Sequence, residues 1–147
     1  MKLQNRSPGG AQMNIAKIMI PKISAAYLLE KNTVRQGLEK FTRYGYTAVP
    51  VLDENGIYVG TVTEGDFLRH IMKLGTTEMR EHETYLIKDI IRKDFCPSLM
   101  IAAEQKDVIS AVMNQNFVPI VDGRGVFCGI ITRKGVIGSL AEQIPEK

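Results

Sequence analysis

Thr63 and Asp66 place a hydroxyl and a carboxylate three residues apart in the segment Gly60-Thr-Val-Thr-Glu-Gly-Asp66. Apolar residues before and after them predict a strand followed by a helix, so both side chains belong to a strand-to-helix corner. A carboxylate there can accept hydrogen bonds from both hydroxyls of a ribose, and the threonine hydroxyl and free N–H groups can face a phosphate. The same spacing also fits a helix capping box, so the residues alone leave a binding role and a structural role open.

The same segment recurs 69 residues later without its carboxylate. Gly129-Ile-Ile-Thr-Arg-Lys-Gly135 keeps the threonine as Thr132 but has Gly135 in place of Asp66. Arg133 and its neighbour Lys134 bring two cations to the predicted helix N-terminus, which disfavours cations unless an anion is near. They are either solvated surface cations or phosphate contacts. Among the binding interpretations, we favour Arg133 reaching across to a phosphate held beside Asp66.

These two corners belong to a longer internal repeat. Residues 47–67 align with residues 116–136 without a gap, and the matches include one proline, one aspartate, two glycines and one threonine. A leading segment, residues 15–19, also aligns with residues 87–91, at an offset of 72. Repetition over this length predicts two copies of one supersecondary unit.

Each copy is predicted to have the order β-α-β-β-α, which is a mixed α/β (α+β) fold class. In the first copy, Thr33-Val-Arg-Gln36 fits a capping box for a helix that ends near Gly45. Strands follow at 46–52 and 57–62, then a helix after Thr63; the second copy has its helices at 104–114 and 133–141 and its strands at 117–121 and 126–131. A unit this small has little core of its own, so we expect the two units to pack together with clefts at the joint.

The predicted organisation follows from the repeat and from composition. Residues 1–12 contain Ser-Pro-Gly-Gly and no periodicity, so we interpret them as a disordered tail or a cloning remnant. The first unit is expected at 13–75, a polar linker at 76–85, the second unit at 86–143 and a short tail at 144–147.

Composition excludes several classes of function. The chain has 147 residues, a net charge of +3 and two cysteines, which gives little electrostatic attraction for nucleic acid and no disulfide framework. Neither a membrane-spanning run nor a secretory signal is found, so we expect a cytoplasmic protein without a membrane partner. His70 and His82 have no nucleophile or metal-binding cluster nearby in the sequence, and there is no P-loop. We therefore predict no catalytic residues, no metal and no enzyme activity.

The run Val-Pro-Val-Leu-Asp-x-x-Gly-x-x-x-Gly-Thr-Val-Thr-x-x-Asp at 49–66, followed by an apolar helix and repeated once, resembles the CBS domain. The pair resembles a Bateman module over about residues 13–143, and its layout is similar to that of stand-alone bacterial CBS pairs. The resemblance implies two units packed as a pseudo-twofold pair, commonly assembled further as a homodimer. It also implies adenine-containing ligands in the clefts between units, among them AMP, ADP, ATP, S-adenosylmethionine and cyclic di-AMP.

The resemblance also implies which residues hold the ligand. The base is expected against two segments, a leading strand that supplies Lys22, Ile23 and Ala25, and the stretch that supplies Tyr46, Thr47 and Ala48. Asp66 is expected to bind the ribose, Thr63 and Thr132 the ribose or phosphate, and Arg133 the phosphate.

The leading hypothesis is therefore a regulatory module that senses an adenine nucleotide and signals by changing its shape or its affinity for a protein partner. No cofactor is required. The alternative is a ligand-free scaffold for dimerisation or interaction. The absence of the aspartate at Gly135 favours the scaffold, whereas the presence of Thr63 and Asp66 favours the sensor.

Overall fold

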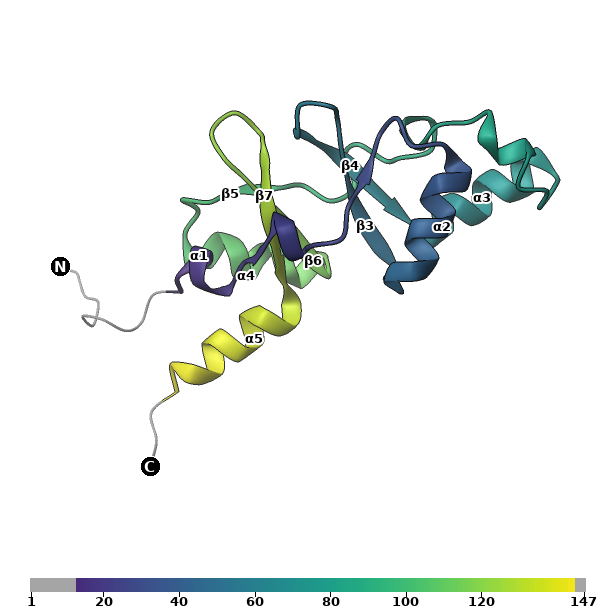
Figure 1. Cartoon of the computed structure of the whole chain (residues 1–147). Helices are drawn as coiled ribbons and strands as arrows, with labels where there is room; N and C mark the ends of the chain where they lie inside the picture. The colour runs from purple at the N-terminus through teal and green to yellow at the C-terminus, as the bar shows by residue number, and fades with distance from the viewer. Residues whose placement is uncertain (1–12, 145–147) are drawn as a thin grey trace.

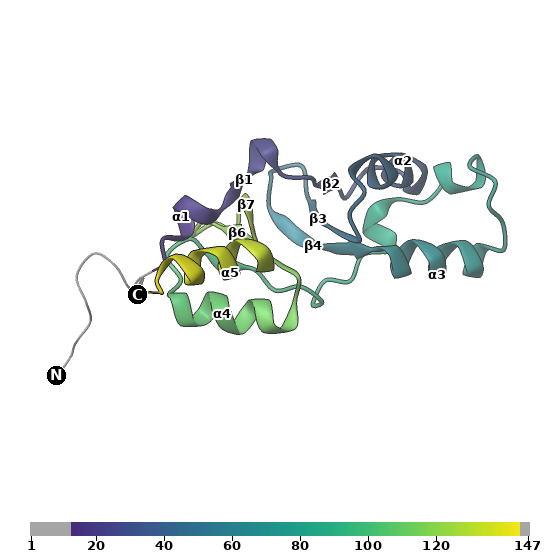
Figure 2. The ribbon, with the colours of Figure 1, turned by 90° about the horizontal axis from the view of Figure 1, so that it is seen from below.

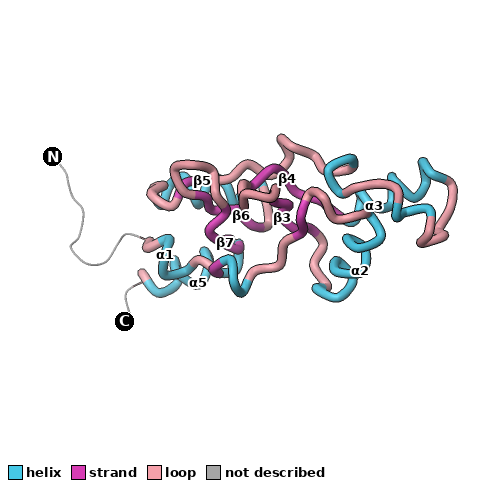
Figure 3. Tube along the Cα trace, turned by 45° about the horizontal axis from the view of Figure 1, so that its top comes forward, coloured by secondary structure: helices cyan, strands magenta, loops and turns pink. Residues whose placement is uncertain are grey.

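The computed structural model describes residues 13–144, so the tail predicted at 1–12 lies outside the described residues. Two sheets occupy the middle of an elongated molecule, and helices lie toward its two ends (Figures 1 and 3).

The first unit consists of β2 (Leu28–Leu29), α2 (Val34–Tyr44), β3 (Ala48–Leu52), β4 (Tyr58–Thr63) and α3 (Glu64–Leu74). The second consists of β5 (Leu99–Met100), α4 (Gln105–Asn114), β6 (Phe117–Val121), β7 (Phe127–Thr132) and α5 (Arg133–Glu142). Both have the predicted β-α-β-β-α order, and the predicted fold class is confirmed.

The two units repeat one another down to the strand register. In the first unit Ala48 pairs with Thr63, and in the second Phe117 pairs with Thr132, 69 residues further along. Each antiparallel hairpin has a register shift one residue before the end of its first strand, at Val51/Leu52 and at Ile120/Val121. The gapless repeat in the sequence is therefore a repeat of backbone geometry, because a single inserted residue would turn every later side chain to the opposite face.

Short-range chemistry fixes the ends of the first unit's helices. Thr33 accepts the N–H of Gln36 and the Gln36 side chain accepts the N–H of Thr33, which confirms the predicted capping box. The helix ends at Gly45, whose φ of 72° lies in the left-handed region that glycine adopts at low cost. Thr63 and Asp66 form the equivalent box at the start of α3.

The leading segments are exchanged between the units. Helix α1 (Ile15–Ile18) and strand β1 (Ile20–Pro21) come first in the chain, yet β1 pairs with β7, and Met13 and Ile15 pack into the core of the second unit. In the opposite direction, Ile87 of the short 3-10 helix η3 (Ile87–Asp89) is fully buried in the core of the first unit. Figures 1 and 2 show α1 beside α5, at the end of the molecule away from α2 and α3. The units predicted at 13–75 and 86–143 thus each lend their first residues to the other's core.

The segments that cross between the units differ in conformation from the prediction. Residues Lys22–Ser24 form a 3-10 turn, η1, in which the N–H of Ala25 donates to the carbonyl of Lys22 at 3.1 Å. The prediction of a strand over 22–25 is therefore wrong. The chain has just left the sheet of one unit and must turn before it joins the other, so its hydrogen bond here closes the turn and does not extend a sheet.

Reciprocal hydrogen bonds join the two hairpin turns. The N–H of Tyr58 donates to the carbonyl of Gly125 at 3.1 Å, and the N–H of Phe127 donates to the carbonyl of Gly56 at 2.9 Å. The repeat offset of 69 converts one bond into the other, so the predicted pseudo-twofold pairing is present in the backbone itself. Both glycines have positive φ, at 82° and 86°, which these turns require.

The polar stretch after α3 packs back onto the first unit. It contains a 3-10 helix, η2 (Glu81–Glu83), whose Glu83 forms an ion pair with Arg35 of α2. The N–H of Val34 donates to the carbonyl of Tyr85 at 2.7 Å. His82 is fully buried beside His70, with 5.2 Å between ring centroids, so it is a packed residue.

The exchanged strand predicts an effect of substitution at Gly129. A Cβ atom there would collide with the carbonyl of Ile20 and lie 3.0 Å from the Cα of Pro21. Gly129→Ala should therefore lower the free energy of unfolding by about 1–3 kcal/mol, as overpacked sites do, measured by urea denaturation. Gly138→Ala is the matched control. Its Cβ would meet nothing within 4 Å on the exposed side of α5, and we expect an increase of about 0.5–1 kcal/mol. Equal stability of the two variants would contradict the close approach.

Candidate functional site

A cleft between the two units is lined from both of them, and we call it the inter-unit cleft. Its volume is about 150 Å³. The lining residues are Ala26, Tyr46, Thr47, Ala48 and Pro50 from the first unit and Asn116, Phe117, Ile130 and Thr132 from the second. Three of the residues predicted to hold a base, Tyr46, Thr47 and Ala48, thus lie together with the predicted phosphate or ribose contact Thr132.

The chemistry of the inter-unit cleft suits a flat, partly polar group. Ala26 and Ala48 are small and leave space, while Phe117, Pro50 and Ile130 supply apolar walls. Thr47, Asn116 and Thr132 add a few hydrogen-bonding groups, which is the composition typical of small-molecule sites. Tyr46 lies at the rim with 55% of its surface exposed, and its ring is free to stack on a ligand.

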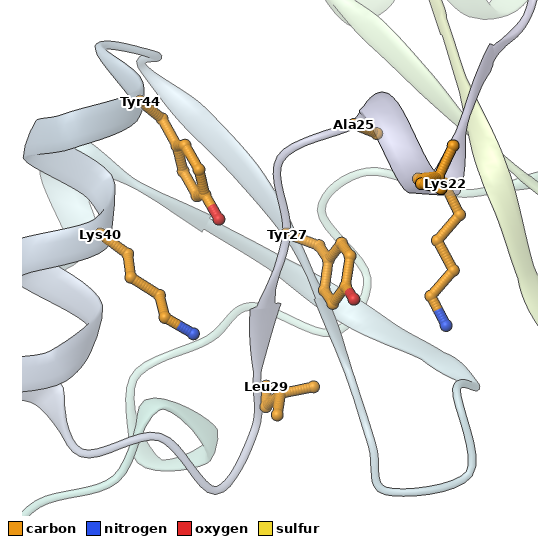
Figure 4. Close-up of a pocket in the computed structure, with 7 residues that line it drawn as sticks. Lys22, Ala25, Tyr27, Leu29, Lys40 and Tyr44 are labelled. Carbon is orange, nitrogen blue, oxygen red and sulfur yellow. The ribbon is translucent and has the colours of Figure 1, made fainter.

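A second, wider hollow lies beside the first, and we call it the lysine cleft. Its volume is about 670 Å³, and its walls are Lys22, Ile23, Ala25, Tyr27, Leu29, Lys40 and Tyr44. Figure 4 shows Lys40 and Tyr44 extending from α2 on one side, Lys22 on the other, and the Tyr27 ring between them. The predicted residues Lys22, Ile23 and Ala25 line this hollow. Ala25 adjoins Ala26 of the inter-unit cleft, and the rings of Tyr44 and Tyr46 are 6.5 Å apart, so the two clefts are neighbours.

The predicted ribose contacts, Thr63 and Asp66, lie in neither of these hollows. The Asp66 carboxylate accepts the N–H of Thr63 at 2.8 Å and the Thr63 hydroxyl at 3.0 Å. It also forms ion pairs with Arg69 at 2.6 Å and with Arg92 at 3.0 Å, and the side chain is only 3% exposed. Arg92 donates a further hydrogen bond to the Thr63 hydroxyl at 3.2 Å. Both groups that were predicted to hold a ribose are therefore already engaged within the chain.

Arg92 belongs to the segment over about 92–98, where the chain crosses from the first unit to the second. Its guanidinium stacks over the Phe95 ring at 4.0 Å. Deeper in, the Tyr58 hydroxyl donates to the carbonyl of Cys96 at 2.6 Å and is 2.7 Å from the Thr61 hydroxyl. Burial raises the pKa of both Tyr58 and Cys96, so both groups stay protonated near neutral pH.

Arg133 is held within its own unit. Its guanidinium donates to the backbone carbonyls of Val112 at 2.8 Å and Gln115 at 3.3 Å. Among the described residues, the cations on the Asp66 carboxylate are Arg69 and Arg92, not Arg133. The cationic residue therefore braces α4 against the start of α5, which accounts for a cation at a helix N-terminus without an anion nearby.

The structure adds residues to both clefts that the sequence reasoning did not select. In the lysine cleft these are Tyr27, Leu29, Lys40 and Tyr44, and in the inter-unit cleft they are Ala26, Pro50, Asn116, Phe117 and Ile130. The repeat gave one available signal, since Asn116 and Phe117 occupy the positions equivalent to Thr47 and Ala48. No group of three or more His, Cys, Asp or Glu residues between 13 and 144 is arranged to hold a metal ion. Within the same range, no helix has the length and apolar character needed to cross a bilayer.

Comparison with known families identifies the repeated unit. The family model described as the CBS domain matches residues 15–73. This segment, which contains the first unit, is similar to a CBS domain. Because the second unit repeats the first in register and topology, the molecule has the arrangement of a tandem pair of such domains. The sequence resemblance is thereby confirmed.

Similar proteins include receptors and ligand complexes. Cyclic di-AMP receptor B of Bacillus subtilis is 26% identical over 133 residues, which is 90% of each chain. CbpB of Listeria monocytogenes, solved in complex with c-di-AMP, is 25% identical with a TM-score of 0.78, covering 88% of this chain and 96% of that one. CBSX2, solved in complex with AMP, is 20% identical with a TM-score of 0.70 over 88% and 96% of the respective chains, and shows the shared fold.

The bonds to Asp66 predict that its removal affects folding. Asp66→Ala deletes half of the α3 capping box and the partner of two arginines, so we expect the free energy of unfolding to fall by about 1–2 kcal/mol in urea denaturation. Glu64→Ala is the matched control, because it removes an exposed acid from the same first turn. A variant of Asp66 as stable as the wild type would contradict the structural role.

Proposed function

We propose that this tandem CBS pair is a regulatory module that binds an adenine nucleotide between its two units and signals by changing its shape or its affinity for a protein partner. The observation that carries the proposal is the inter-unit cleft, whose walls come from both halves of the repeat. The names of the relatives support an adenine ligand, since two of them bind cyclic di-AMP or are named for it and a third was solved with AMP.

The site works by binding alone. The base lies between the apolar walls formed by Ala48 and Phe117, and the Tyr46 ring covers its open side. Thr132 sits at the N-terminus of α5 and offers its hydroxyl to a ribose or phosphate at the rim. Lys22 and Ala25 lie on the side toward the lysine cleft, where phosphates are attracted. No bond of the ligand is made or broken.

The Thr63 and Asp66 pair has a different place in this proposal. Their predicted ribose contact requires Arg92 to leave them, because the arginine forms an ion pair with the Asp66 carboxylate and donates to the Thr63 hydroxyl. We therefore assign the nucleotide to the inter-unit cleft and a structural role to Asp66.

Signalling requires that two states of the protein differ in their affinity for the nucleotide. A ligand in the inter-unit cleft touches both units, so it favours whichever position of the cleft walls brings both of them into contact with it. The regulated partner is a protein that recognises one of those positions. The nature of the site fits a receptor that responds to ligand concentration, as distinct from an enzyme.

A thermal-shift titration tests the proposal. AMP, ADP, ATP and cyclic di-AMP are titrated against the wild type, with GTP as the control ligand. A bound ligand at about 100 times its dissociation constant stabilises the fold by about 2.7 kcal/mol, which raises the melting temperature by several degrees. Tyr46→Ala should abolish most of that shift while leaving the ligand-free melting temperature within about 1 °C, because the ring is largely exposed.

Met113→Ala is the matched control for Tyr46→Ala. It truncates an exposed apolar side chain of α4 that lines neither cleft. Cooperative melting with no shift by any adenine ligand would overturn nucleotide sensing and favour the scaffold alternative instead.

We also propose that the module assembles as a homodimer through its α3 and α5 helices. The repeat relates Leu68 of α3 to Ile137 of α5, and both are 60% exposed. Met72, one turn beyond Leu68, is also exposed. Apolar side chains at equivalent positions of two equivalent helices suit a symmetric interface between copies, because such an interface uses the same patch twice.

The dimer predicts a change of mass on charge insertion. Leu68→Glu should convert the dimer to a monomer in size-exclusion chromatography with light scattering, since a carboxylate would lose its water in the apolar interface. Met113→Glu, which places the same charge on an exposed site of α4, should leave the mass unchanged. A wild-type monomer, or loss of the dimer in both variants, would refute this interface.

A further inference from the structure

The lysine cleft contains two cations that no acidic side chain neutralises. Among the residues at 13–144, no carboxylate lies within ion-pairing distance of the Lys22 or Lys40 ammonium group. Two of the lysines in this range, Lys31 and Lys106, do have such partners, in Glu54 at 3.1 Å and Glu104 at 3.7 Å. The Lys22 ammonium group lies over the face of the Tyr27 ring, 5.5 Å from its centroid, and close to the turn at Gly56. Two unpaired cations in one hollow attract an anion with more than one negative group.

Apolar surface surrounds these cations. Ile23 is 94% exposed at the edge of the cleft, and Leu29 and Tyr44 are also exposed. Figure 4 shows the Tyr44 hydroxyl directed into the hollow from α2, with the Lys40 ammonium group on the same side. An inorganic anion would pair with the lysines but would leave the apolar surface exposed to solvent. Aromatic and aliphatic side chains interleaved with lysines are better matched by a ligand that carries both phosphates and a planar base.

The sizes of the two clefts point the same way. The inter-unit cleft holds about 150 Å³, below the 300–1,000 Å³ typical of small-molecule sites, whereas the neighbouring lysine cleft holds about 670 Å³. They adjoin along Ala25 and Ala26, and at the rim along Tyr44 and Tyr46. A ligand that places one base in the inter-unit cleft therefore directs the rest of its structure toward the lysines.

From these observations we infer that Lys22, Lys40 and Tyr44 form a second subsite that selects an adenine dinucleotide over a mononucleotide. The inference rests on the proposed function, since it takes the first base to lie in the inter-unit cleft. The two lysines, with the Tyr44 hydroxyl as a further donor, bind the phosphodiester groups, and the exposed surface of Ile23, Leu29 and Tyr44 receives the second nucleoside. Helix α2 thereby takes part in ligand selection, which neither the repeat nor the Thr-x-x-Asp pattern indicates.

The test measures dissociation constants by isothermal titration calorimetry for cyclic di-AMP, AMP and cyclic di-GMP. The wild type should bind cyclic di-AMP at least 10-fold more tightly than AMP. Lys40→Gln should weaken cyclic di-AMP binding about 10-fold, leave AMP within about twofold, and reduce the salt dependence of cyclic di-AMP binding. Tyr44→Phe should show a smaller loss in the same ligand. Cyclic di-GMP has the same two phosphodiesters with another base, and weak binding of it places the base selectivity in the inter-unit cleft.

Arg43→Gln is the matched control, because it removes one positive charge from the same helix at a residue that does not line the cleft. It should leave all three affinities within about twofold. An equal loss of affinity for cyclic di-AMP in Lys40→Gln and Arg43→Gln would show that only the net charge of the protein matters, and it would overturn the subsite. Tighter binding of AMP than of cyclic di-AMP by the wild type would overturn the inference and leave the proposed function standing, whereas binding of neither would overturn both. Circular dichroism and melting temperatures establish that each variant is folded.

Discussion

Neither unit of this molecule can close its core with contiguous sequence. Met13 and Ile15 complete the core built on α4, α5 and β7, while Ile87 completes the core built on α2, α3 and β3. The chain must therefore cross between the units twice, once over about 22–26 and once over about 92–98. Because each crossing passes the joint, the clefts at that joint are made by the exchange itself, and burial of the exchanged apolar side chains holds the units together.

The two crossings have opposite outcomes because their residues differ. At the second, Arg92 meets Asp66 and stacks on Phe95, and Tyr58 and Thr61 provide hydroxyls beneath. At the first, the equivalent positions hold no such chemistry: Ile20, Gly135, Phe127 and Ile130 replace Arg92, Asp66, Tyr58 and Thr61. Without an ion pair to draw a side chain inward, the first crossing leaves the inter-unit cleft open. The symmetry of the backbone is thus kept while the symmetry of the sites is lost.

The parts of the fold that depend on residues close together in the chain could be predicted from the sequence. The repeat predicted two β-α-β-β-α units, and the capping boxes at Thr33 and Thr63 mark where helices begin. The exchange was out of reach because the pattern of residues 15–19 fits the core of either unit equally well. The ion pair of Asp66 with Arg92 could not be predicted either. The two residues are 26 positions apart, and no local pattern indicates that their side chains meet. The position of Lys40 in the lysine cleft was not predicted for a related reason. It lies on a helix whose apolar residues are explained by packing alone, so nothing in the sequence indicated a ligand there.

The contacts between the two units restrict which segments of this molecule can move. The hairpin turns are tied by two backbone hydrogen bonds, and each core contains residues from both halves of the chain, so the units cannot separate without exposing buried apolar surface. The crossing over 22–26 is held more weakly, because it forms only a short turn, carries the almost fully exposed Ile23 and lines both clefts. A ligand that draws Lys22 toward Lys40 would reposition that turn at small cost, whereas rotating the units would break the paired turns. The movement that a ligand causes most easily is therefore a shift of this turn, and not a rotation of one unit against the other.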